Sequence, residues 1–540
     1  MNKAQYIILK YFSIIIYSFL LSSSLFYTYK INDLISSKTL KDSNFYIIDK
    51  SDFIQIIQYF LPIFIIIFIS LFLFNYIKIT NTSLSNFSTI KITILLFIAW
   101  IPYLFAFFPC IGAADTYYIL RNMIGISVQH PFFYNLFIGI PSKVSLFLFN
   151  TMTYGLFFST LIQMLFMSYS ISYMIVWINS KLKNRYIVYI LVLYFAIAPI
   201  IIDYSITAIK DTIFSVTIML WIPLLYEIFV NNRNIFVTKA DKLNFCILAF
   251  LTIATRNNGK FIFVIILCFL LYKCIQERKQ LLKYSITLLI ICSLPNFILS
   301  NFFNKPQLFQ EAVAIPIQQL ARTVTLNGKL NNESKDYLNK IIPLEQLKKS
   351  YDPLKVDSIK WNKNFNRNYL QKSKQKFIKT WEKEFWNNKR IYLDAWALQT
   401  YACWANNTPA WGSQSKFGLS MTDDVLKNQK PPNHSKLKVS SINLPKQFKE
   451  ILGNYLFNHS NYINPGNCFW ILSYIALLLI SKNKLSELIV LLPIFLCWVS
   501  LMLAVPLSTA YRYAFIYPLC LPFLVFIPFI IKERKENLNV

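Results

Sequence analysis

The 540-residue sequence is poor in charge, glycine and histidine. Charged residues make up only 15% of it, whereas soluble domains average about 25%. Its 10 glycines and 22 prolines are too few for a collagen-like chain or a Pro/Gly-rich disordered one. Three histidines exclude a histidine-rich metal site, but they leave open a divalent cation bound by carboxylates.

The sequence also has none of the short motifs that mark common soluble enzymes or nucleic-acid binders. The patterns GxxxxGK(S/T), GxGxxG, HExxH and GxSxG are missing, as are zinc-finger and RNP motifs. Without such a motif, the net charge of +29 does not indicate nucleic acid. Many basic residues lie in short connections between apolar runs, where they determine membrane topology. We therefore expect no nucleic-acid partner.

Nine cysteines without a CxxC pair say little about redox compartment. Most of them lie inside apolar runs, where cysteine behaves as a small hydrophobic residue. Cys110 and Cys403 both fall in segments that we expect outside the membrane, so a disulfide between them stays open.

Long apolar runs are what the sequence has in abundance. Hydrophobic residues make up 55% of the chain, aromatic residues make up 17%, and the mean hydropathy is +0.44. The fold class that we expect is an all-α polytopic membrane protein with about 12 transmembrane helices, because runs of roughly 17–25 apolar residues cross a bilayer as helices. The run 243–273 counts as two short helices around the polar stretch Arg256-Asn257-Asn258-Gly259-Lys260. The other runs are 6–26, 54–76, 92–108, 152–178, 186–202, 212–230, 284–301, 467–481, 486–505 and 514–531.

Basic residues between the runs set the expected topology. Loops with several Lys or Arg fall on one side, which the positive-inside rule assigns to the cytoplasm, and both termini lie there too. Residues 132–149, which follow His130-Pro131, would reverse every later loop if they crossed the membrane. We therefore expect this segment to lie along or dip into the outer leaflet. The membrane that we expect is the cytoplasmic (inner) membrane of a bacterium.

Residues 302–466 differ in kind from the rest of the chain. They are rich in Lys, Asn, Trp and Tyr, lack long apolar runs, and carry 25 Lys and Arg against 12 Asp and Glu, a net charge of +13. We expect a mostly α extracytoplasmic domain here, inserted before the last three spans. The rest of the chain then forms a transmembrane core (1–301), with a first outer loop (109–151), and C-terminal transmembrane helices (467–540).

Polar residues at the outer ends of the expected spans are the candidates for chemistry, because ionisable groups beside hydrocarbon are costly. Asp115, directly after a span, fits a general base or a metal ligand. Lys210, Arg256 and Arg512 fit the recognition of a phosphate. Structural alternatives stay open: helix capping for Asp115 and Asp211, snorkelling for Arg256, and a place at the membrane interface for Arg512.

A further candidate cluster opens the external domain. Gln318, Gln319 and Arg322 lie on one face of an expected helix and fit the hydrogen bonding of sugar hydroxyls and phosphate. An ordinary amphipathic helix would explain the same residues.

Taken in order, these clusters resemble the GT-C superfamily of integral membrane glycosyltransferases, which use lipid-phosphate-linked sugar donors. The closest likeness is to a poorly characterised bacterial branch. Each matching piece is short, so the specificity lies in their order and their shared outer-face placement. The pieces are Pro109-x-x-Gly112-x-x-Asp115 with His130-Pro131, Lys210-Asp211, Arg256-Asn257-Asn258-Gly259, residues 315–322, and Tyr511-Arg512-Tyr513.

The resemblance implies roles for the residues of these pieces. Asp115 would activate the acceptor or bind a divalent cation such as Mg²⁺ or Mn²⁺. Many superfamily members carry paired acids in the first loop, whereas this sequence offers one, with Asp203 or Asp211 as candidates for a second. The residues expected to bind the donor phosphate or another part of the substrates are Lys210, Asp211, Arg256, Asn258, Gln318, Gln319, Arg322, Arg512 and His130.

These observations together predict an enzyme. It would be a membrane glycosyltransferase that moves a sugar from a polyprenyl-phosphate-linked donor to a cell-envelope glycan, lipid or protein acceptor on the outer face. One alternative is a polymerase of lipid-linked repeat units, and another is a transporter or flippase of a lipid-linked glycan. Transporters tend to place charges near the bilayer midplane and to contain internal repeats, and the sequence has neither feature.

Overall fold

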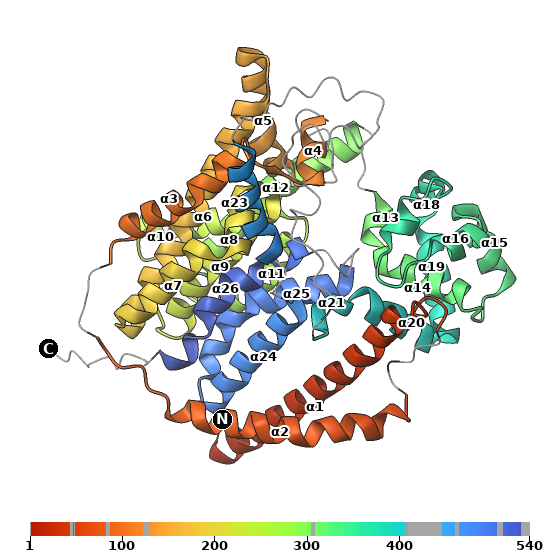
Figure 1. The fold of residues 1–540 in the computed structure, drawn as a ribbon, viewed down its shortest axis with the longest axis horizontal. Helices are drawn as coiled ribbons and strands as arrows, with labels where there is room; N and C mark the ends of the chain where they lie inside the picture. Colours follow the sequence, from red (N-terminus) through yellow and green to blue (C-terminus); the bar gives the residue numbers. More distant parts are fainter. Residues whose placement is uncertain are drawn as a thin grey trace.

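The computed structural model describes residues 2–43, 47, 49–82, 87–121, 130–303, 308–406, 408, 445–459, 464–504 and 511–530. Within them the chain is helical apart from turns, short connections and one two-stranded ladder (Figure 1). The elements up to residue 302 are α1 (Lys3–Ser36), α2 (Asp52–Tyr76), α3 (Thr89–Ala106), β1 (Ile111–Gly112), α4 (Ala114–Arg121), α5 (Phe132–Phe149), α6 (Thr153–Leu182), α7 (Arg185–Ile197), α8 (Pro199–Ile206), β2 (Thr207–Ala208), α9 (Lys210–Phe229), α10 (Lys239–Thr255), α11 (Gly259–Lys273) and α12 (Arg278–Phe302).

The later elements form a group of short helices followed by a return to long apolar ones. The short helices are α13 (Phe309–Ala312), α14 (Ala314–Thr325), α15 (Asn332–Ile341), α16 (Leu344–Ser350), α17 (Asp357–Lys360), α18 (Arg367–Lys372), α19 (Lys374–Asn387), α20 (Lys389–Gln399), α21 (Tyr401–Trp404) and α23 (Lys446–His459). The elements that end the chain are α24 (Pro465–Ser481), η4 (Leu485–Leu491), α25 (Leu492–Ala504), η5 (Tyr511–Ala514), α26 (Ile516–Leu524) and η6 (Ile527–Phe529).

Nine helical segments of the described residues are long and apolar enough to cross a membrane. A tenth is the pair α7 and α8, which are bent by 57° at the break before Pro199. The chain is therefore an all-α protein of the membrane type, as the sequence predicts. Because α10, α11 and α24 have only 17, 15 and 17 residues, the count of about twelve spans stays a prediction. The nine are α1, α2, α3, α5, α6, α9, α12, Leu485–Ala504 and Arg512–Phe529.

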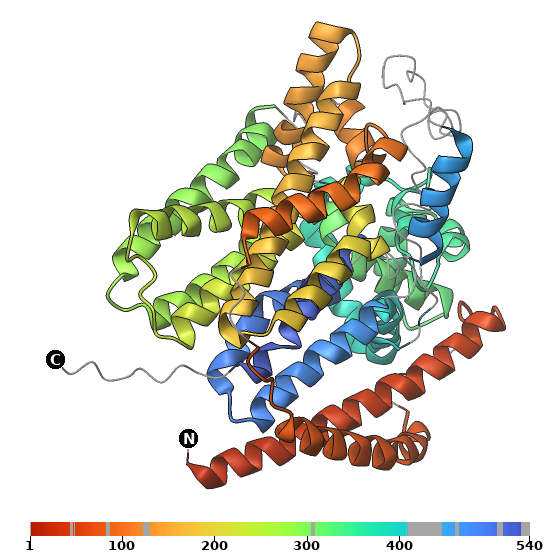
Figure 2. The same cartoon turned by 60° about the vertical axis from the view of Figure 1, so that its left-hand side comes forward.

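Helix α5 is one of these nine, although the basic loops argue against its crossing the membrane. It runs back along the first half of α6, because only residues 150–152 connect the two helices. The Ser159 hydroxyl donates to the Phe137 carbonyl across this pair, at 3.0 Å. The antiparallel pair projects from the rest of the bundle (Figure 2).

The polar break predicted in the run 243–273 is present. Helix α10 ends at Thr255 and α11 begins at Gly259. A Cβ atom on Gly259 would lie 1.9 Å from the carbonyl oxygen of Thr252, so only glycine lets the two helices meet this closely. The break therefore holds Arg256 in a fixed position between two helix ends.

Helix α9 is the centre of the bundle. Of the nine candidate spans it is the most deeply buried, and α6, α10, α26 and η4 pack around it. A helix that is hydrophobic all round belongs inside a larger helical assembly, and this one carries charge only at its first two residues and near its end. Those first two residues, Lys210 and Asp211, are the pair that the sequence singled out.

Helices α13–α20 form a group of short helices beside the bundle (Figure 1). Their apolar faces make a core of their own, which includes Leu320, Tyr337, Ile359 and Phe377. Helix α1 contacts α21, which directly follows this group: the Tyr401 hydroxyl donates to Asn32 Oδ1 at 2.8 Å. The domain limits of 302 and 466 stay a prediction.

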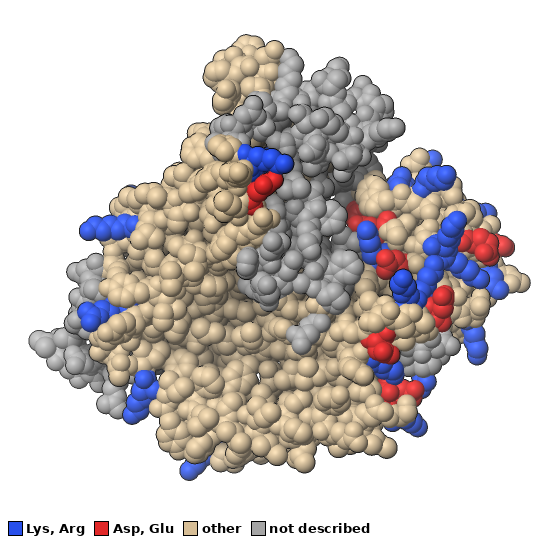
Figure 3. All heavy atoms as spheres, in the orientation of Figure 1, with Lys and Arg blue, Asp and Glu red and all other residues tan. Residues whose placement is uncertain are grey.

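Charged side chains are distributed unevenly over the surface. In the face that Figure 3 draws, they gather on the α13–α20 body, whereas the surface over α1, α2 and α24 is almost free of them. That uncharged surface carries exposed large apolar side chains, such as Phe12 on α1 and Phe72 on α2. Apolar patches of this extent on a protein surface indicate contact with lipid or with other protein.

The disulfide that the sequence left open is not formed. Cys110 and Cys403 are both free thiols, and they are buried in two different apolar clusters.

The close contact between α5 and α6 gives a test of the fold. A Cβ atom on Gly155 would lie 2.1 Å from the Pro141 carbonyl oxygen, so Gly155→Ala must push the helices apart. Alanine favours a helix over glycine by about 1 kcal/mol, but the clash should outweigh this, since overpacking costs about 1–3 kcal/mol. We expect a lower Tm in detergent. Phe158→Ala, at an exposed position of the same helix, serves as the control, and a Gly155→Ala protein as stable as wild type would contradict the packing.

Candidate functional site

Two short backbone segments bring the candidate residues together. β1 and β2 pair in parallel, with Ile111 opposite Thr207 and Gly112 opposite Ala208. The ends of parallel strands lie at the same edge, so the residues that follow each strand face one another. Asp115, in the first turn of α4, and Lys210, at the start of α9, are those residues.

Thr116 fixes the start of α4 against this ladder. Its hydroxyl donates to the Ala208 carbonyl and accepts from the Ala113 N–H at 3.3 Å. The side chain that bonds the backbone at the start of α4 is thus Thr116, and among the described residues no backbone N–H donates to the Asp115 carboxylate. The Asp115 carboxylate is left to face three other side chains.

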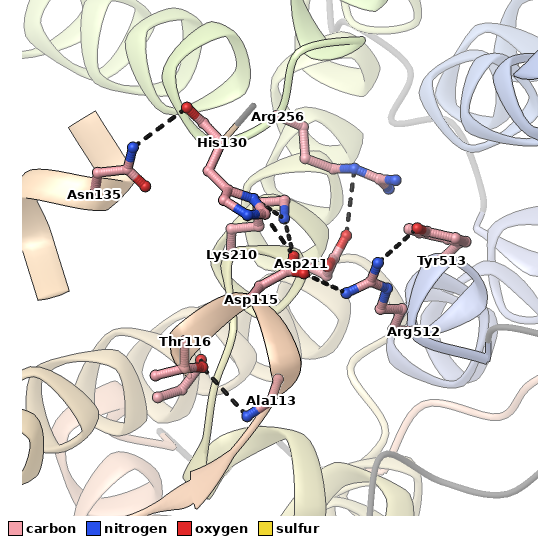
Figure 4. Close-up of polar contacts among 11 residues, drawn as sticks. Ala113, Asp115, Thr116, His130, Asn135, Lys210, Asp211, Arg256, Arg512 and Tyr513 are labelled. Carbon is pink, nitrogen blue, oxygen red and sulfur yellow. Dashed lines mark hydrogen bonds and ion pairs between the residues drawn. The ribbon is translucent and has the colours of Figure 1, made fainter. Parts of the chain in front are cut away.

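Asp115 is the centre of a cluster of charged side chains (Figure 4). Its Oδ2 atom accepts a hydrogen bond from the Lys210 ammonium, and its Oδ1 atom lies 3.1 Å from Nη1 of Arg512. His130 Nδ1 lies 3.7 Å from Asp115 Oδ2 and 3.2 Å from Lys210 Nζ. Asn135 of α5 holds the His130 carbonyl with its side-chain amide at 3.4 Å.

A second ion pair adjoins the first. Arg256 Nε lies 3.3 Å from Oδ1 of Asp211, the residue after Lys210. Tyr513 connects the two pairs, because the Arg512 guanidinium donates to its hydroxyl at 2.7 Å and the Arg256 guanidinium lies over its ring, 5.0 Å from the centroid. Cation–π contacts of this kind are stronger where water is excluded.

Burial and neighbouring charge fix the protonation states at the centre. Burial alone would raise the pKa of Asp115, but the positive charges of Lys210 and Arg512 hold it well below its usual range. Burial, with the nearby Lys210 charge, lowers the pKa of His130 to about 4, against an opposing effect of Asp115. At neutral pH the imidazole is therefore uncharged, and its Nδ1 atom accepts from Lys210.

The cluster has more positive than negative charge. Three cations, Lys210, Arg256 and Arg512, face two carboxylates, Asp115 and Asp211, which leaves a net charge of +1. All five side chains are largely buried, so the surplus is poorly screened by water. An anion with several oxygen acceptors, such as a phosphate, would complete the site.

The sequence analysis did not identify Tyr134, which lies at the edge of this cluster. Its side chain is only 2% exposed, and its hydroxyl has no hydrogen-bond partner among the described residues. An unsatisfied buried hydroxyl costs free energy, which a ligand that hydrogen-bonds to it would recover. Tyr134 lies in the first turn of α5, four residues after His130, and this closeness in sequence to a candidate residue was the available signal.

An apolar groove of about 560 Å³ begins beside the cluster. Helices α5, α6, α9 and α10 line it, and their lining residues include Tyr134, Ile213, two residues after Asp211, and Thr255, directly before Arg256. The exposed side chains of Ile140 and Ile162 line it as well. The volume lies in the range of small-molecule sites, about 300–1,000 Å³.

The remaining candidates lie elsewhere. Asn258 ties the break between α10 and α11 to α25, because its amide donates to the Ser500 hydroxyl at 2.8 Å. Gln318, Gln319 and Arg322 are buried in the core of the α13–α20 body. Asp203 is fully buried in α8 and accepts from the Thr207 hydroxyl at 3.1 Å.

The partners of the three α14 residues are structural. Gln318 donates to the Asp352 carbonyl, and Gln319 accepts from the Trp381 indole at 2.7 Å. Arg322 is fully buried and donates to the Ser43 carbonyl at 3.1 Å. These contacts hold the three side chains within the α13–α20 body and, for Arg322, against residue 43, so the structure does not bring them to the charged cluster.

A match to a protein family covers the whole of this site. The family described as "Family of unknown function (DUF6020)" matches residues 63–539, which include every member of the cluster. The chain belongs to the DUF6020 family. No curated protein and no solved structure matches it.

The side chains around Asp115 do not fit a divalent cation. Mg²⁺ and Ca²⁺ need about six oxygen ligands, whereas the charged groups that the described residues bring to this carboxylate are an ammonium, a guanidinium and an imidazole. No group of three or more His, Cys, Asp or Glu able to hold a metal occurs in the part of this DUF6020 protein that the structure describes. We therefore derive no step through a metal.

The low pKa of His130 gives a test of the cluster. The unfolded chain binds the His130 proton near pH 6.5, whereas the folded chain binds it near pH 4. The free energy of unfolding therefore decreases as pH falls through this window, by up to about 3 kcal/mol. We expect His130→Gln to remove this loss, measured as Tm in detergent from pH 4 to 7.

The difference between the two curves is the quantity to compare. Asp394, whose pKa burial raises to about 7, titrates in the same range and in the opposite direction, but it is present in both proteins. Parallel curves for wild type and His130→Gln would show that His130 is not held neutral by burial and by Lys210.

Proposed function

We propose that the protein is a membrane glycosyltransferase that moves a sugar from a polyprenyl-phosphate-linked donor to an acceptor of the cell envelope. The acceptor hydroxyl would belong to a glycan, a lipid or a protein on the outer face of a bacterial cytoplasmic membrane. The observation that carries the proposal is the convergence of Asp115, Lys210, Arg256 and Arg512 from four separate parts of the chain.

The surroundings of the cluster support a substrate that is both anionic and apolar. A surplus positive charge favours a phosphate, and the groove between α5 and α10 offers carbon surface directly beside it. Soluble sugar nucleotides would have no use for such a groove. A sugar joined to a lipid through phosphate uses both features.

The chemistry follows from the groups present. The acceptor hydroxyl attacks the anomeric carbon and forms the new glycosidic C–O bond, and its proton passes to the Asp115 carboxylate. The bond between the anomeric carbon and the phosphate oxygen breaks, and the phosphate leaves with the electron pair. Lys210, Arg256 and Arg512 stabilise the charge that develops on it.

Without substrate, the cluster keeps the basicity of Asp115 low. With Lys210 and Arg512 on its two oxygens, Asp115 has a low pKa and is a weak base. A bound phosphate would draw both cations toward itself, and the carboxylate would gain basicity as it loses their charge. Substrate binding and base activation are therefore coupled in this proposal.

The variant Asp115→Asn tests the assigned base. It keeps the size of the side chain but removes the proton acceptor, so transfer should fall by about 100- to 10,000-fold. The measurement is mass spectrometry of envelope glycans from a deletion strain that carries wild type, Asp115→Asn or Asp336→Asn. Asp336 is an exposed acid of α15 and serves as the control.

Two outcomes decide this test. Loss of one defined sugar, restored by wild type and by Asp336→Asn only, would support the assignment. Full restoration by an Asp115→Asn protein that elutes as a folded species would remove Asp115 from the catalytic role.

The topology can be tested separately. We propose that α13–α20 lie outside and that the loop before α10 lies in the cytoplasm. A cysteine at Lys335, exposed on α15, should react with an impermeant maleimide in intact cells, whereas one at Lys239 should react only after lysis. Reaction in the reverse order would invert the topology and would place the cluster on the cytoplasmic side.

A further inference from the structure

A second apolar groove, of about 600 Å³, runs between α1 and α24 and reaches α20, α21 and α25. The two helices lie side by side in both views (Figures 1 and 2). Phe12, Ile16 and Leu20 of α1 line the groove with exposed side chains. It shares no helix with the groove between α5 and α10.

The lining of this groove is largely apolar. Four tryptophans line it, and each indole N–H is used in a hydrogen bond to a backbone carbonyl, at 2.7–3.2 Å. The hydroxyls of Ser13, Ser23 and Ser24 likewise donate to backbone carbonyls. A ligand therefore finds few free polar groups here, which suits a hydrocarbon chain. The tryptophans are Trp396, Trp404, Trp470 and Trp498.

The length of the groove fits a chain longer than an ordinary acyl chain. Its lining on α1 runs from Leu9 to Tyr27, which at 1.5 Å per residue is about 27 Å. The hydrocarbon core of a bilayer is about 30 Å thick, and an acyl chain of a phospholipid covers about half of it. A chain that fills the groove thus extends almost across the membrane, as a polyisoprenoid can.

The outer end of the groove adjoins the charged cluster. Trp396, Trp404 and Trp498 pack with Met502 in an apolar group, and Tyr513 packs against the same group. Tyr513 is also the residue that contacts both Arg512 and Arg256. Tyr513 therefore belongs both to the apolar group at this end of the groove and to the contacts of the two guanidinium groups.

We propose that the groove between α1 and α24 binds the hydrocarbon chain of the acceptor, so that the acceptor is itself a polyisoprenoid-linked glycan. The proposal rests on the function proposed above, in which the groove between α5 and α10 takes the chain of the donor. One groove lies beside the charged cluster and the other is connected to it through Tyr513, so the two grooves would hold two chains with their polar ends near each other. Transfer to a lipid-linked sugar and polymerisation of lipid-linked units both require this arrangement.

Photolabelling with two lipids tests this assignment. The probes are polyprenyl phosphate with a diazirine near the end of its chain, and phosphatidylglycerol with a diazirine in one acyl chain. Labelled peptides are then mapped by mass spectrometry in wild type and in variants that fill one groove. Ala476→Trp fills the groove between α1 and α24, and Leu251→Trp fills the groove between α5 and α10.

We expect the polyprenyl probe to label both grooves in the wild-type protein. Ala476→Trp should lower labelling of α1 and α24 by about tenfold, equivalent to about 1.4 kcal/mol, and leave α5 and α10 labelled. Leu251→Trp should have the reverse effect. Ile471→Trp, at an exposed position of α24 that does not line the groove, should change neither.

The possible failures are distinguishable. Labelling confined to α5 and α10, or equal labelling of α1 and α24 by phosphatidylglycerol, would overturn the acceptor site and leave the donor site intact. If Lys210→Met left the labelling of α5 and α10 undiminished, the proposed function would be overturned instead, because binding of the lipid phosphate would then not depend on the cluster.

Discussion

The parallel pairing of β1 with β2 is the contact on which the charged cluster depends. It joins the segment after α3 to the segment before α9, and it places Asp115 against Lys210 although they are far apart in sequence. The ladder has only two residues per strand, so side chains must reinforce it. Thr116 does so by bonding the Ala208 carbonyl, and Gln163 of α6 donates to the Thr207 carbonyl at 2.7 Å. The position of the acid is thus set by the backbone and by buried polar side chains.

The cost of burying charge explains why the cluster is built as a network. A single charge in this position would be expensive, whereas two carboxylates among three cations leave one unit of surplus charge. Removing one charged side chain would leave another one buried without its partner. The same network therefore offsets the cost of its own burial and attracts an anion, because the surplus charge is already desolvated before the anion arrives.

Much of the fold could be predicted from the sequence because its physical basis is local. Apolar runs must become helices in a bilayer, and the polar stretch at Arg256 had to interrupt one. The charged residues at the ends of helices were also recognisable, since such groups rarely occur beside hydrocarbon. What the sequence could not provide was their partners. Gln319 and Arg322 also carry polar side chains that could bind a substrate. In the fold they bond instead to Trp381 and to the Ser43 carbonyl, both distant in sequence.

The two grooves and the cluster together impose an order on the proposed reaction. Asp115 is a weak base while Lys210 and Arg512 hold it, so an acceptor that arrives first meets a carboxylate unable to activate it. In the proposed reaction the donor phosphate relieves this restraint, and only then can Asp115 take the proton of the attacking hydroxyl. Water is small enough to reach the site at any time, and it too is a hydroxyl nucleophile. Coupling the basicity of Asp115 to donor binding does not exclude water from the site. The second groove favours the acceptor over water, because an acceptor anchored by its chain holds its hydroxyl at the cluster at a high effective concentration.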